Sequence, residues 1–117
     1  MLALSAQLKI YIAIEPVDFR NGIDGIGGIC RNKLGRDPSS GAYFVFRNKR
    51  KTTIKILAYD GNGFWLCTKR LSRGRLKWWP TAASHYSSLK MAELQTIIMG
   101  GDPKDAEFGS DWKKLLR

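Results

Sequence analysis

The residues of this chain that could do chemistry are its lysines and arginines, which gather in one segment. Ten of the twenty Lys and Arg residues lie between Arg47 and Lys77, where Asp60 is the only acid, and the 117-residue chain has a formal net charge of +10. Collecting like charge on one folded surface costs stability through self-repulsion, and a polyanionic partner would account for it. The segment therefore favours contact with nucleic acid phosphates over the plainer alternative of a solvated charged face.

Residues for catalysis are poorly represented. Phosphoryl transfer on DNA needs carboxylates gathered around two metal ions. The four candidates fall in a helix cap, two helices and a turn of the predicted structure: Asp18, Asp24, Glu93 and Asp60. His85, the only histidine, lies in a polar connector without candidate partners. We therefore expect no enzyme activity, no metal, no cofactor and no small-molecule substrate.

Length and composition predict one folded domain. Chains of roughly 100 to 150 residues usually close a single core, and the apolar share of 44% is sufficient for one. We expect the domain over residues 1–103, followed by a tail, 104–117, that forms a terminal helix or a frayed end. No segment approaches the roughly 20 apolar residues that cross a membrane, and the start lacks the features of a signal peptide. The sequence thus predicts a cytoplasmic protein without a membrane partner.

The first third of the chain predicts a strand and then a helix. Apolar residues alternate over 8–14, which is the period of a half-buried strand. Asp18 can then cap a helix over 19–34, whose apolar residues recur every three or four positions, and Gly35 is placed to end it. Four glycines inside this segment each cost up to about 1 kcal/mol relative to alanine, so the helix needs tertiary packing.

Four further strands are predicted over 42–47, 52–59, 64–71 and 75–79. Connections of about four residues join antiparallel neighbours, so these strands should form a meander. In a meander the turns at 48–51 and 72–74 lie at one end of the sheet, and the turn with Asp60 lies at the other. Eight cations would then converge on one edge, which we call the basic rim: Arg47, Lys49, Arg50, Lys51, Lys69, Arg70, Arg73 and Arg75.

One aromatic side chain extends this predicted surface. Most tyrosines and tryptophans should belong to the core, but alternation over 75–79 places Trp79 on the same face as Arg75 and Lys77. An exposed aromatic ring there could stack on an unpaired base. Lys77 and Trp79 are therefore added to the candidate nucleic-acid-binding residues.

The rest of the chain completes an α+β prediction. A small, polar connector over 81–88 follows Pro80, and a short helix is expected over 89–99. We therefore predict an antiparallel sheet of about five strands, with the helix at 19–34 packed on one face and a short C-terminal helix.

A succession of short motifs resembles a known family. The segments are 18–25 (DFRNGIDG), 37–41 (DPSSG), 44–48 (FVFRN), 59–66 (YDGNGFWL), 69–71 (KRL), 74–75 (GR) and 79–80 (WP). In this order they resemble the small accessory proteins, often called TnpB, that bacterial insertion sequences of the IS66 family encode. The resemblance spans about residues 8–102 and depends on the succession, since each motif alone is weak.

The resemblance implies a role in transposition beside a separate, larger transposase, with no catalytic residues to transfer. Asp18, Arg20 and Asp24 match the first motif. They could bind a partner, or Arg20 and Asp24 could form an ion pair one helical turn apart. Three roles stay open: a DNA-binding accessory factor, a module that docks on the transposase, and a regulator of the element's transcription. We favour the first because of the basic rim.

Overall fold

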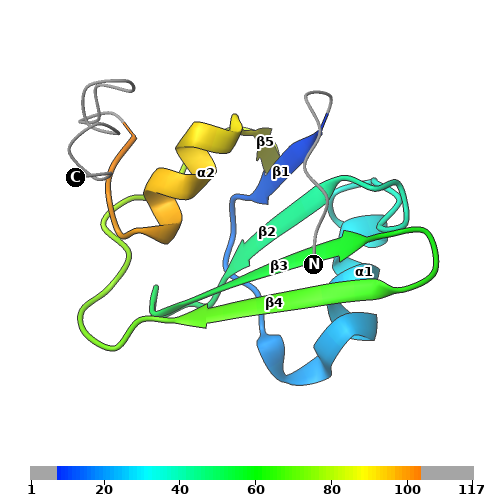
Figure 1. Ribbon diagram of the computed structural model, residues 1–117, viewed down its shortest axis with the longest axis horizontal. Helices are drawn as coiled ribbons and strands as arrows, with labels where there is room; N and C mark the ends of the chain where they lie inside the picture. The colour runs from blue at the N-terminus through cyan, green and yellow to red at the C-terminus, as the bar shows by residue number, and fades with distance from the viewer. Residues whose placement is uncertain (1–7, 104–117) are drawn as a thin grey trace.

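The computed structural model describes residues 8–103 and confirms an α+β fold with five strands and two helices (Figure 1). The predicted tail at 104–117 lies outside the described residues. In chain order the elements are β1 (Ile10–Ala13), a 3-10 turn (Phe19–Asn21), α1 (Gly22–Asn32), β2 (Tyr43–Arg47), β3 (Thr53–Tyr59), β4 (Phe64–Arg70), β5 (Tyr86–Ser88) and α2 (Met91–Ile98).

The strands β2, β3 and β4 form the predicted antiparallel meander. Arg47 pairs with Ile54 across the first hairpin, and Thr53 pairs with Arg70 across the second. The sheet order is β4-β3-β2-β1-β5, and β1 runs parallel to β2. An all-antiparallel sheet was therefore wrong in one place. A parallel neighbour requires a crossover connection, which α1 supplies between β1 and β2.

The predicted strand at 75–79 was wrong, and a strand within the supposed connector takes its place. Leu76 and Trp79 are both buried, so the alternation of a strand is broken there. The fifth strand is β5, which pairs with β1 in antiparallel register, with Tyr86 opposite Ala13. Hydrogen bonds from Ile14 N to His85 O and from Leu89 N to Ile10 O flank this pairing at 2.9 Å.

One face of the sheet packs against α1. Ile26, Cys30 and Leu34 meet the β2 side chains Phe44 and Phe46. The helix differs from the prediction at both ends. Gly22 interrupts its start, because a φ of 61° and a ψ of −151° separate the 3-10 turn from α1.

The end of α1 is set by Gly35. This glycine has a φ of 63°, in the left-handed region that favours glycine. The following N–H of Arg36 donates to Cys30 O at 2.9 Å, so the chain turns back over the last turn of the helix. Leu34 therefore belongs to the core but not to the helix.

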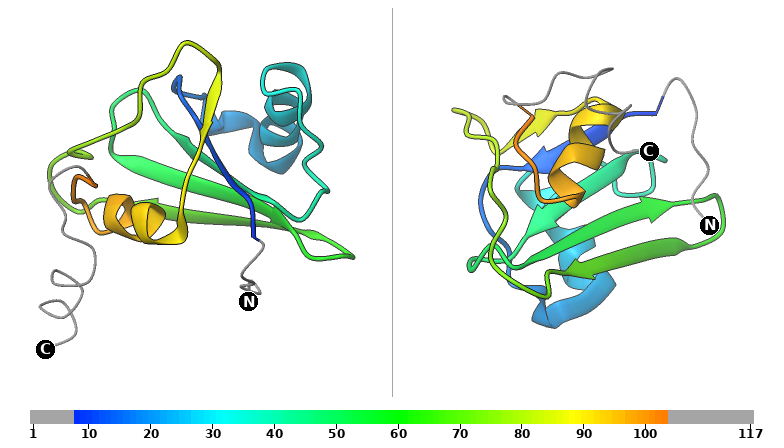
Figure 2. Two further views of the ribbon diagram at one scale, coloured as in Figure 1. Left: turned by 90° about the horizontal axis from the view of Figure 1, so that it is seen from above. Right: turned by 60° about the vertical axis from the view of Figure 1, so that its left-hand side comes forward.

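The other face of the sheet is covered by α2 and by the irregular segment that leads to it (Figure 2). Leu94, Ile97, Leu76 and Trp79 form one cluster with alternate residues of β1, β2 and β3. The two clusters are separated by the sheet, so each helix covers one face. No helix within residues 8–103 is long and apolar enough to cross a membrane.

Candidate nucleic-acid interface

The turn between β2 and β3 is built around Asn48. Its Oδ1 accepts hydrogen bonds from Thr52 N at 2.9 Å and Thr53 N at 3.1 Å, and its Nδ2 donates to Thr52 Oγ1 at 2.8 Å. A backbone hydrogen bond from Lys51 N to Asn48 O closes the turn. Lys51 has a φ of 60°, a conformation that is uncommon for any residue except glycine. The turn thus holds three consecutive cations, of which one stands in a strained position.

A second basic segment is tied to this turn by the backbone. Leu71 N donates to Thr52 O at 2.8 Å, and Leu76 N donates to Lys51 O at 2.7 Å. Between these bonds the chain reverses at Gly74, whose φ is 67°. The residues 72–75 therefore lie at the same end of the sheet as the turn at 48–51, as predicted. We call this the basic end.

Seven cations at the basic end are exposed and have no side-chain hydrogen bond or ion pair with any residue in 8–103. They are Lys49, Arg50, Lys51, Arg70, Arg73, Arg75 and Lys77. Unpaired, exposed Lys and Arg side chains are free to contact phosphate oxygens. These seven carry the candidate interface.

The two other cations of the basic rim have structural contacts. Arg47 is half-buried, its Nη1 donates to Asn48 O at 3.1 Å, and its guanidinium lies 5.8 Å from the centre of the Trp79 ring. Burial lowers the pKa of Arg47, and its buried Nε has no hydrogen-bond partner among the described residues. Lys69 Nζ donates to Ile98 O at 2.7 Å, near the end of α2. Both side chains therefore have a contact within the fold, unlike the seven unpaired cations.

Trp79 does not belong to this surface. It is 7% exposed, and its Nε1 donates to Ala13 O at 2.8 Å. The prediction of an exposed ring assumed a strand at 75–79. Without that strand the indole enters the core beneath α2, so stacking on a base would require the core to open.

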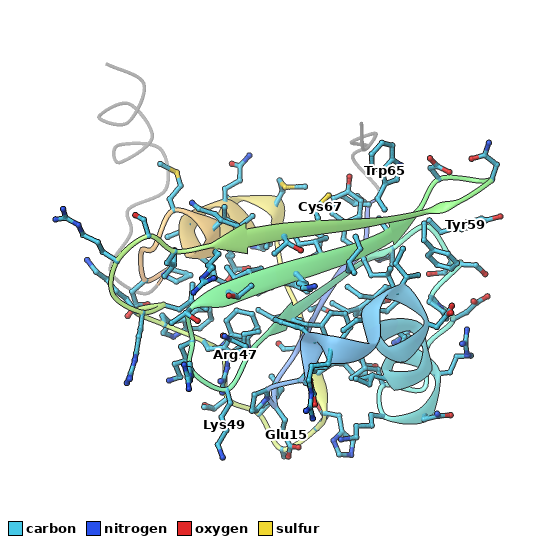
Figure 3. All side chains as sticks on the ribbon, turned by 90° about the horizontal axis from the view of Figure 1, so that it is seen from below. Glu15, Arg47, Lys49, Tyr59, Trp65 and Cys67 are labelled. Carbon is cyan, nitrogen blue, oxygen red and sulfur yellow. The ribbon has the colours of Figure 1, made fainter. Side chains whose placement is uncertain are left out.

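Asp60 lies at the opposite end of the sheet, which we call the Asp60 end. Tyr59 pairs with Phe64 at the last position of the β3–β4 hairpin. Seven strand residues separate this end from the basic end, a distance of about 20 Å at roughly 3.4 Å per residue. Figure 3 shows Arg47 and Lys49 at one end and Tyr59 and Trp65 toward the other. The only acid of the basic segment is thus kept away from its cations.

The side chain of Asp60 is fully engaged in its own turn. Its Oδ1 accepts from Asn62 N and Gly63 N, and its Oδ2 accepts from Trp65 Nε1 at 2.7 Å. These hydrogen bonds, the one from Asn62 N first, lower the pKa of Asp60. The carboxylate therefore stabilises a turn.

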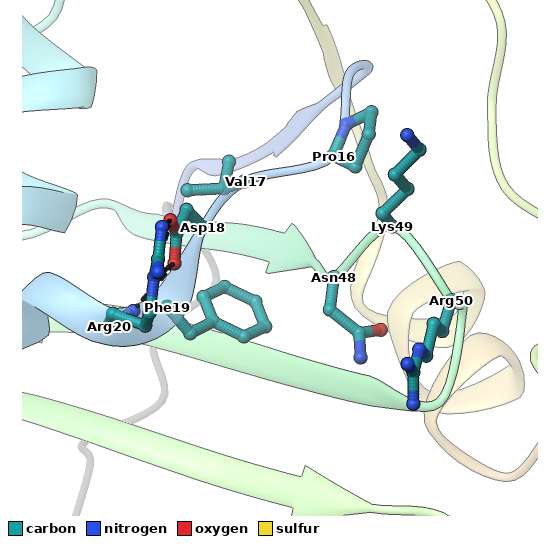
Figure 4. Close-up of a pocket in the computed structure, with 8 residues that line it drawn as sticks. All are labelled: Pro16, Val17, Asp18, Phe19, Arg20, Asn48, Lys49 and Arg50. Atoms are coloured by element: carbon teal, nitrogen blue, oxygen red, sulfur yellow. Dashed lines mark hydrogen bonds and ion pairs between the residues drawn. The ribbon is translucent and has the colours of Figure 1, made fainter.

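The residues of the first motif reach the basic end by another route. Because β1 runs parallel to β2, the chain leaving β1 passes beside the turn at 48–51, and Val17 N donates to Arg47 O at 2.9 Å. A cleft of about 650 Å³ lies between the two (Figure 4). Its lining residues are Pro16, Val17, Asp18, Phe19, Arg20, Asn48, Lys49 and Arg50.

The ion pair between Arg20 and Asp24, one of the two alternatives for the first motif, does not form. Arg20 instead binds Asp18, with Nη2 at 2.6 Å from Oδ2 and Nε at 2.9 Å from the same oxygen. Arg20 side-chain hydrogen bonds lower the pKa of Asp18. The break at Gly22 removes the continuous helix that an i,i+4 pair needs. Asp24 is exposed in the first turn of α1 and does not line the cleft.

Asn48 is the positioning residue that the sequence analysis missed. The sequence did contain an indication of this role, because Asn favours the first position of a tight turn, where its side chain can hydrogen-bond to the backbone.

Among residues 8–103, no three His, Cys, Asp or Glu side chains are grouped so that they could hold a metal ion.

Comparison with known proteins identifies a family that agrees with the resemblance of the short motifs. The family model described as IS66 Orf2 like protein matches residues 8–107. Two similar proteins come from Sinorhizobium fredii (strain NBRC 101917 / NGR234). Uncharacterized protein y4jC is 39% identical over 104 residues, 87% of this chain and 86% of that protein. Uncharacterized protein y4hO is 32% identical over 102 residues, 87% of this chain and 88% of that protein.

No solved structure matches the chain. The family model nevertheless spans the whole described fold and both segments of the basic end. The chain therefore belongs to the IS66 Orf2-like family, and this membership implies an accessory role in transposition.

Proposed function

We propose that the protein is a non-catalytic accessory factor of transposition that binds the phosphate backbone of DNA through its basic end. The observation that carries the proposal is the set of seven exposed cations without partners within residues 8–103. Two separate segments, 48–51 and 70–77, supply them, and backbone hydrogen bonds hold these segments together. A solvated surface would not need such convergence.

Phosphate contact fits the geometry better than base reading. Six of the cations stand on turns and irregular segments and Arg70 stands at the end of β4, whereas α1 and α2 each pack an apolar side on the sheet. Direct readout uses a helix or a two-stranded ribbon inserted into the major groove. Backbone contacts position a protein on DNA without reading its sequence, which suits an accessory factor.

A salt titration tests the proposal. If about six of the cations contact phosphates, log affinity for duplex DNA should fall against log salt with a slope of about −5. Single-stranded DNA and RNA probes in the same titration identify the preferred nucleic acid. Absence of duplex binding at low salt, or binding that salt does not weaken, would refute DNA binding by this surface.

A matched pair of variants locates the surface. Arg50→Gln with Arg73→Gln removes two cations from the basic end, and Lys9→Gln with Arg31→Gln removes two exposed cations elsewhere. Lys9 precedes β1 at the Asp60 end, where its carbonyl accepts from Tyr43 N. The first pair should reduce the salt slope by about 2 and the second should leave it nearly unchanged. Equal losses would indicate a diffuse charge effect.

A second candidate function is docking on the transposase, and the cleft favours it. The cleft combines apolar side chains such as Phe19 with the cations Lys49 and Arg50 at its margin. An acidic segment of a partner would meet both. Co-purification with the element's transposase after nuclease treatment, lost in Phe19→Ala but kept in Lys9→Gln, would support docking. Loss of the complex on nuclease treatment would show that DNA bridges the two proteins.

A further inference from the structure

The strand β4 forms an open edge of the sheet. It is the terminal strand in the order β4-β3-β2-β1-β5, and β3 is its only neighbour within residues 8–103. It is seven residues long, and six of its residues are exposed. The strand at the other edge, β5, has three residues. Long, flat edge strands are templates for pairing with another strand, whereas short ones are poor templates.

The backbone groups that β4 offers can be identified from its pairing with β3. Leu71 N donates to Thr52 O, and Gly63 O accepts from Asp60 N, so the odd-numbered positions 63–71 point toward β3. Strand residues alternate, so the N–H and C=O groups of residues 64, 66, 68 and 70 point outward. They have no partner in residues 8–103. Four consecutive outward positions are enough for a regular ladder.

The side chains of β4 leave most of this edge unprotected. Phe64 is 37% exposed and Trp65 is 40% exposed, although both are large and apolar. The protecting charges, Lys69 and Arg70, stand at one end of the strand only. The strand thus has an aromatic end and a cationic end. Parallel pairing of two copies would place like charges together, whereas antiparallel pairing places each aromatic end beside a cationic end.

We propose that β4 pairs with β4 of a second copy of this chain, in antiparallel register about a two-fold axis at Cys67. This register overlaps all seven residues and uses all four outward positions. It places Trp65 of one copy opposite Lys69 of the other, and Phe64 opposite Arg70. An aromatic ring beside a cation contributes about 0.5–1 kcal/mol at an exposed site. The two five-stranded sheets become one continuous sheet.

The charge distribution agrees with this arrangement. The two-fold axis places the basic ends of the two copies at opposite ends of the joined strands, about 20 Å apart along a seven-residue strand. Exposed charges separated by more than about 8 Å are largely screened at physiological salt. The Asp60 turn of each copy directly precedes Phe64, so in this register it lies toward the basic segment of the other copy. The high net charge therefore does not oppose this dimer strongly.

The mass of the DNA-free protein tests the association. Full-length, nuclease-treated protein at moderate salt should have twice the chain mass of 13.2 kDa in analytical ultracentrifugation. A mass of 13.2 kDa at all concentrations up to about 100 times the concentration needed for DNA binding overturns the proposal. A larger complex that forms only when DNA is added overturns it as well.

Cysteine crosslinking tests the register. In the proposed pairing the two Cys67 residues form a non-hydrogen-bonded pair with Cα atoms about 4.5 Å apart, within the range of a disulfide. Mild copper–phenanthroline oxidation in air should couple the two thiols. Cys67→Ser should abolish the crosslink, and Cys30→Ser should leave it intact, because Cys30 is fully buried. Thr68→Cys in the Cys67→Ser background should crosslink more slowly, and equal rates overturn the register.

A backbone variant tests the hydrogen-bonded edge. Thr68→Pro removes one outward N–H without removing a bond to β3. It should convert the dimer to a monomer, while Thr68→Val, which keeps the N–H, should remain dimeric. Circular dichroism shows whether each variant is folded. A folded Thr68→Pro protein that remains dimeric overturns pairing through β4. Should Thr68→Pro fail to fold, Trp65→Lys, which sets two lysines opposite each other, should weaken the dimer at least tenfold.

Discussion

The two ends of the β3 strand carry turns that use their charged side chains in different ways. At the Asp60 end, the carboxylate accepts three hydrogen bonds, from two backbone N–H groups and the Trp65 indole. At the basic end, an uncharged residue, Asn48, makes the equivalent bonds, and the side chains of Lys49, Arg50 and Lys51 make none within residues 8–103. One turn uses its charge to hold its own shape. The other is held by an amide and leaves its charges free.

This contrast distinguishes charged side chains that stabilise the fold from charged side chains that can still bind a partner. A charged group whose hydrogen-bonding atoms are all satisfied internally has little left to offer a partner. A group without internal partners has its full capacity available, and seven such groups at one end of a sheet form a binding surface. The four predictions below test the contrast, and they run from the largest expected effect to the smallest.

Removing the free charges of the basic turn should have the largest effect. Lys49→Gln, Arg50→Gln and Lys51→Gln together should lower duplex DNA affinity by about 10²- to 10³-fold at roughly 0.1 M salt, since each lost phosphate contact reduces the salt slope by about 0.9. Fluorescence anisotropy with a labelled duplex measures this. The control, Lys9→Gln, Arg31→Gln and Lys90→Gln, removes three exposed cations outside the basic end. A comparable loss in the control would remove the distinction between the two ends.

Removing Asn48 should affect both stability and binding although the charge is unchanged. In Asn48→Ala, Thr52 N and Thr53 N lose their acceptor in a half-buried turn. The free energy of unfolding should fall by about 1–3 kcal/mol. Because the turn also positions three cations, DNA affinity should fall at a temperature where the variant is folded. Urea denaturation and anisotropy give the two values. Unchanged affinity would mean that the cations bind without a fixed turn.

Substituting the residue with positive φ in each turn should change the free energy of unfolding in opposite directions at the two ends. Lys51 and Gly61 have φ values of 60° and 106°. Lys51→Gly relieves strain and should raise the free energy of unfolding by up to about 1 kcal/mol, while weakening DNA binding through the lost charge. Gly61→Ala introduces strain and should destabilise by about 1 kcal/mol without changing DNA binding. Thermal melts and anisotropy test both. Equal behaviour of the two variants would contradict the proposed division of roles.

The Asp60 turn should contribute a small dependence of stability on pH. Its folded-state pKa is lowered from the ordinary value of 3.8, so the stabilisation is complete above that value and is lost as the pH falls through it toward the lowered pKa. Stability should therefore fall less between pH 7 and pH 3 in Asp60→Asn than in the unmodified protein. Urea denaturation at several pH values measures the difference. Part of the dependence should remain, because the pKa values of Asp18 and Asp37 are also lowered.

Much of the fold and of the candidate interface was accessible from local pattern. The hairpins at 48–52 and 60–63 connect alternating segments through short polar turns, and such connections allow only antiparallel neighbours. Once the meander was set, the convergence of the turn at 48–51 with the segment at 72–74 followed from chain direction. The placement of Lys49, Arg50 and Arg73 at one end of the sheet could be predicted because it depends on these turns alone.

The errors concern residues whose environment is set by distant segments. Trp79 packs in the core beneath α2, and its Nε1 donates a hydrogen bond to Ala13 O, 66 residues earlier in the chain. The position beside β1 was filled by Tyr86–Ser88, a polar segment without a strand-like pattern. Arg20 forms its ion pair with Asp18 and not with Asp24, because Gly22 interrupts the helix between Arg20 and Asp24.

The sequence by itself determined the antiparallel meander and the separation of Asp60 from the cations, since short turns and alternation act over a few residues. Only the tertiary structure decided that β1 lies parallel to β2, that Trp79 is buried, and that β4 remains an open edge. The physical reason is that burial and sheet position depend on which segments compete for the same core and the same strand edge. That competition involves the whole chain, so no local pattern records its outcome.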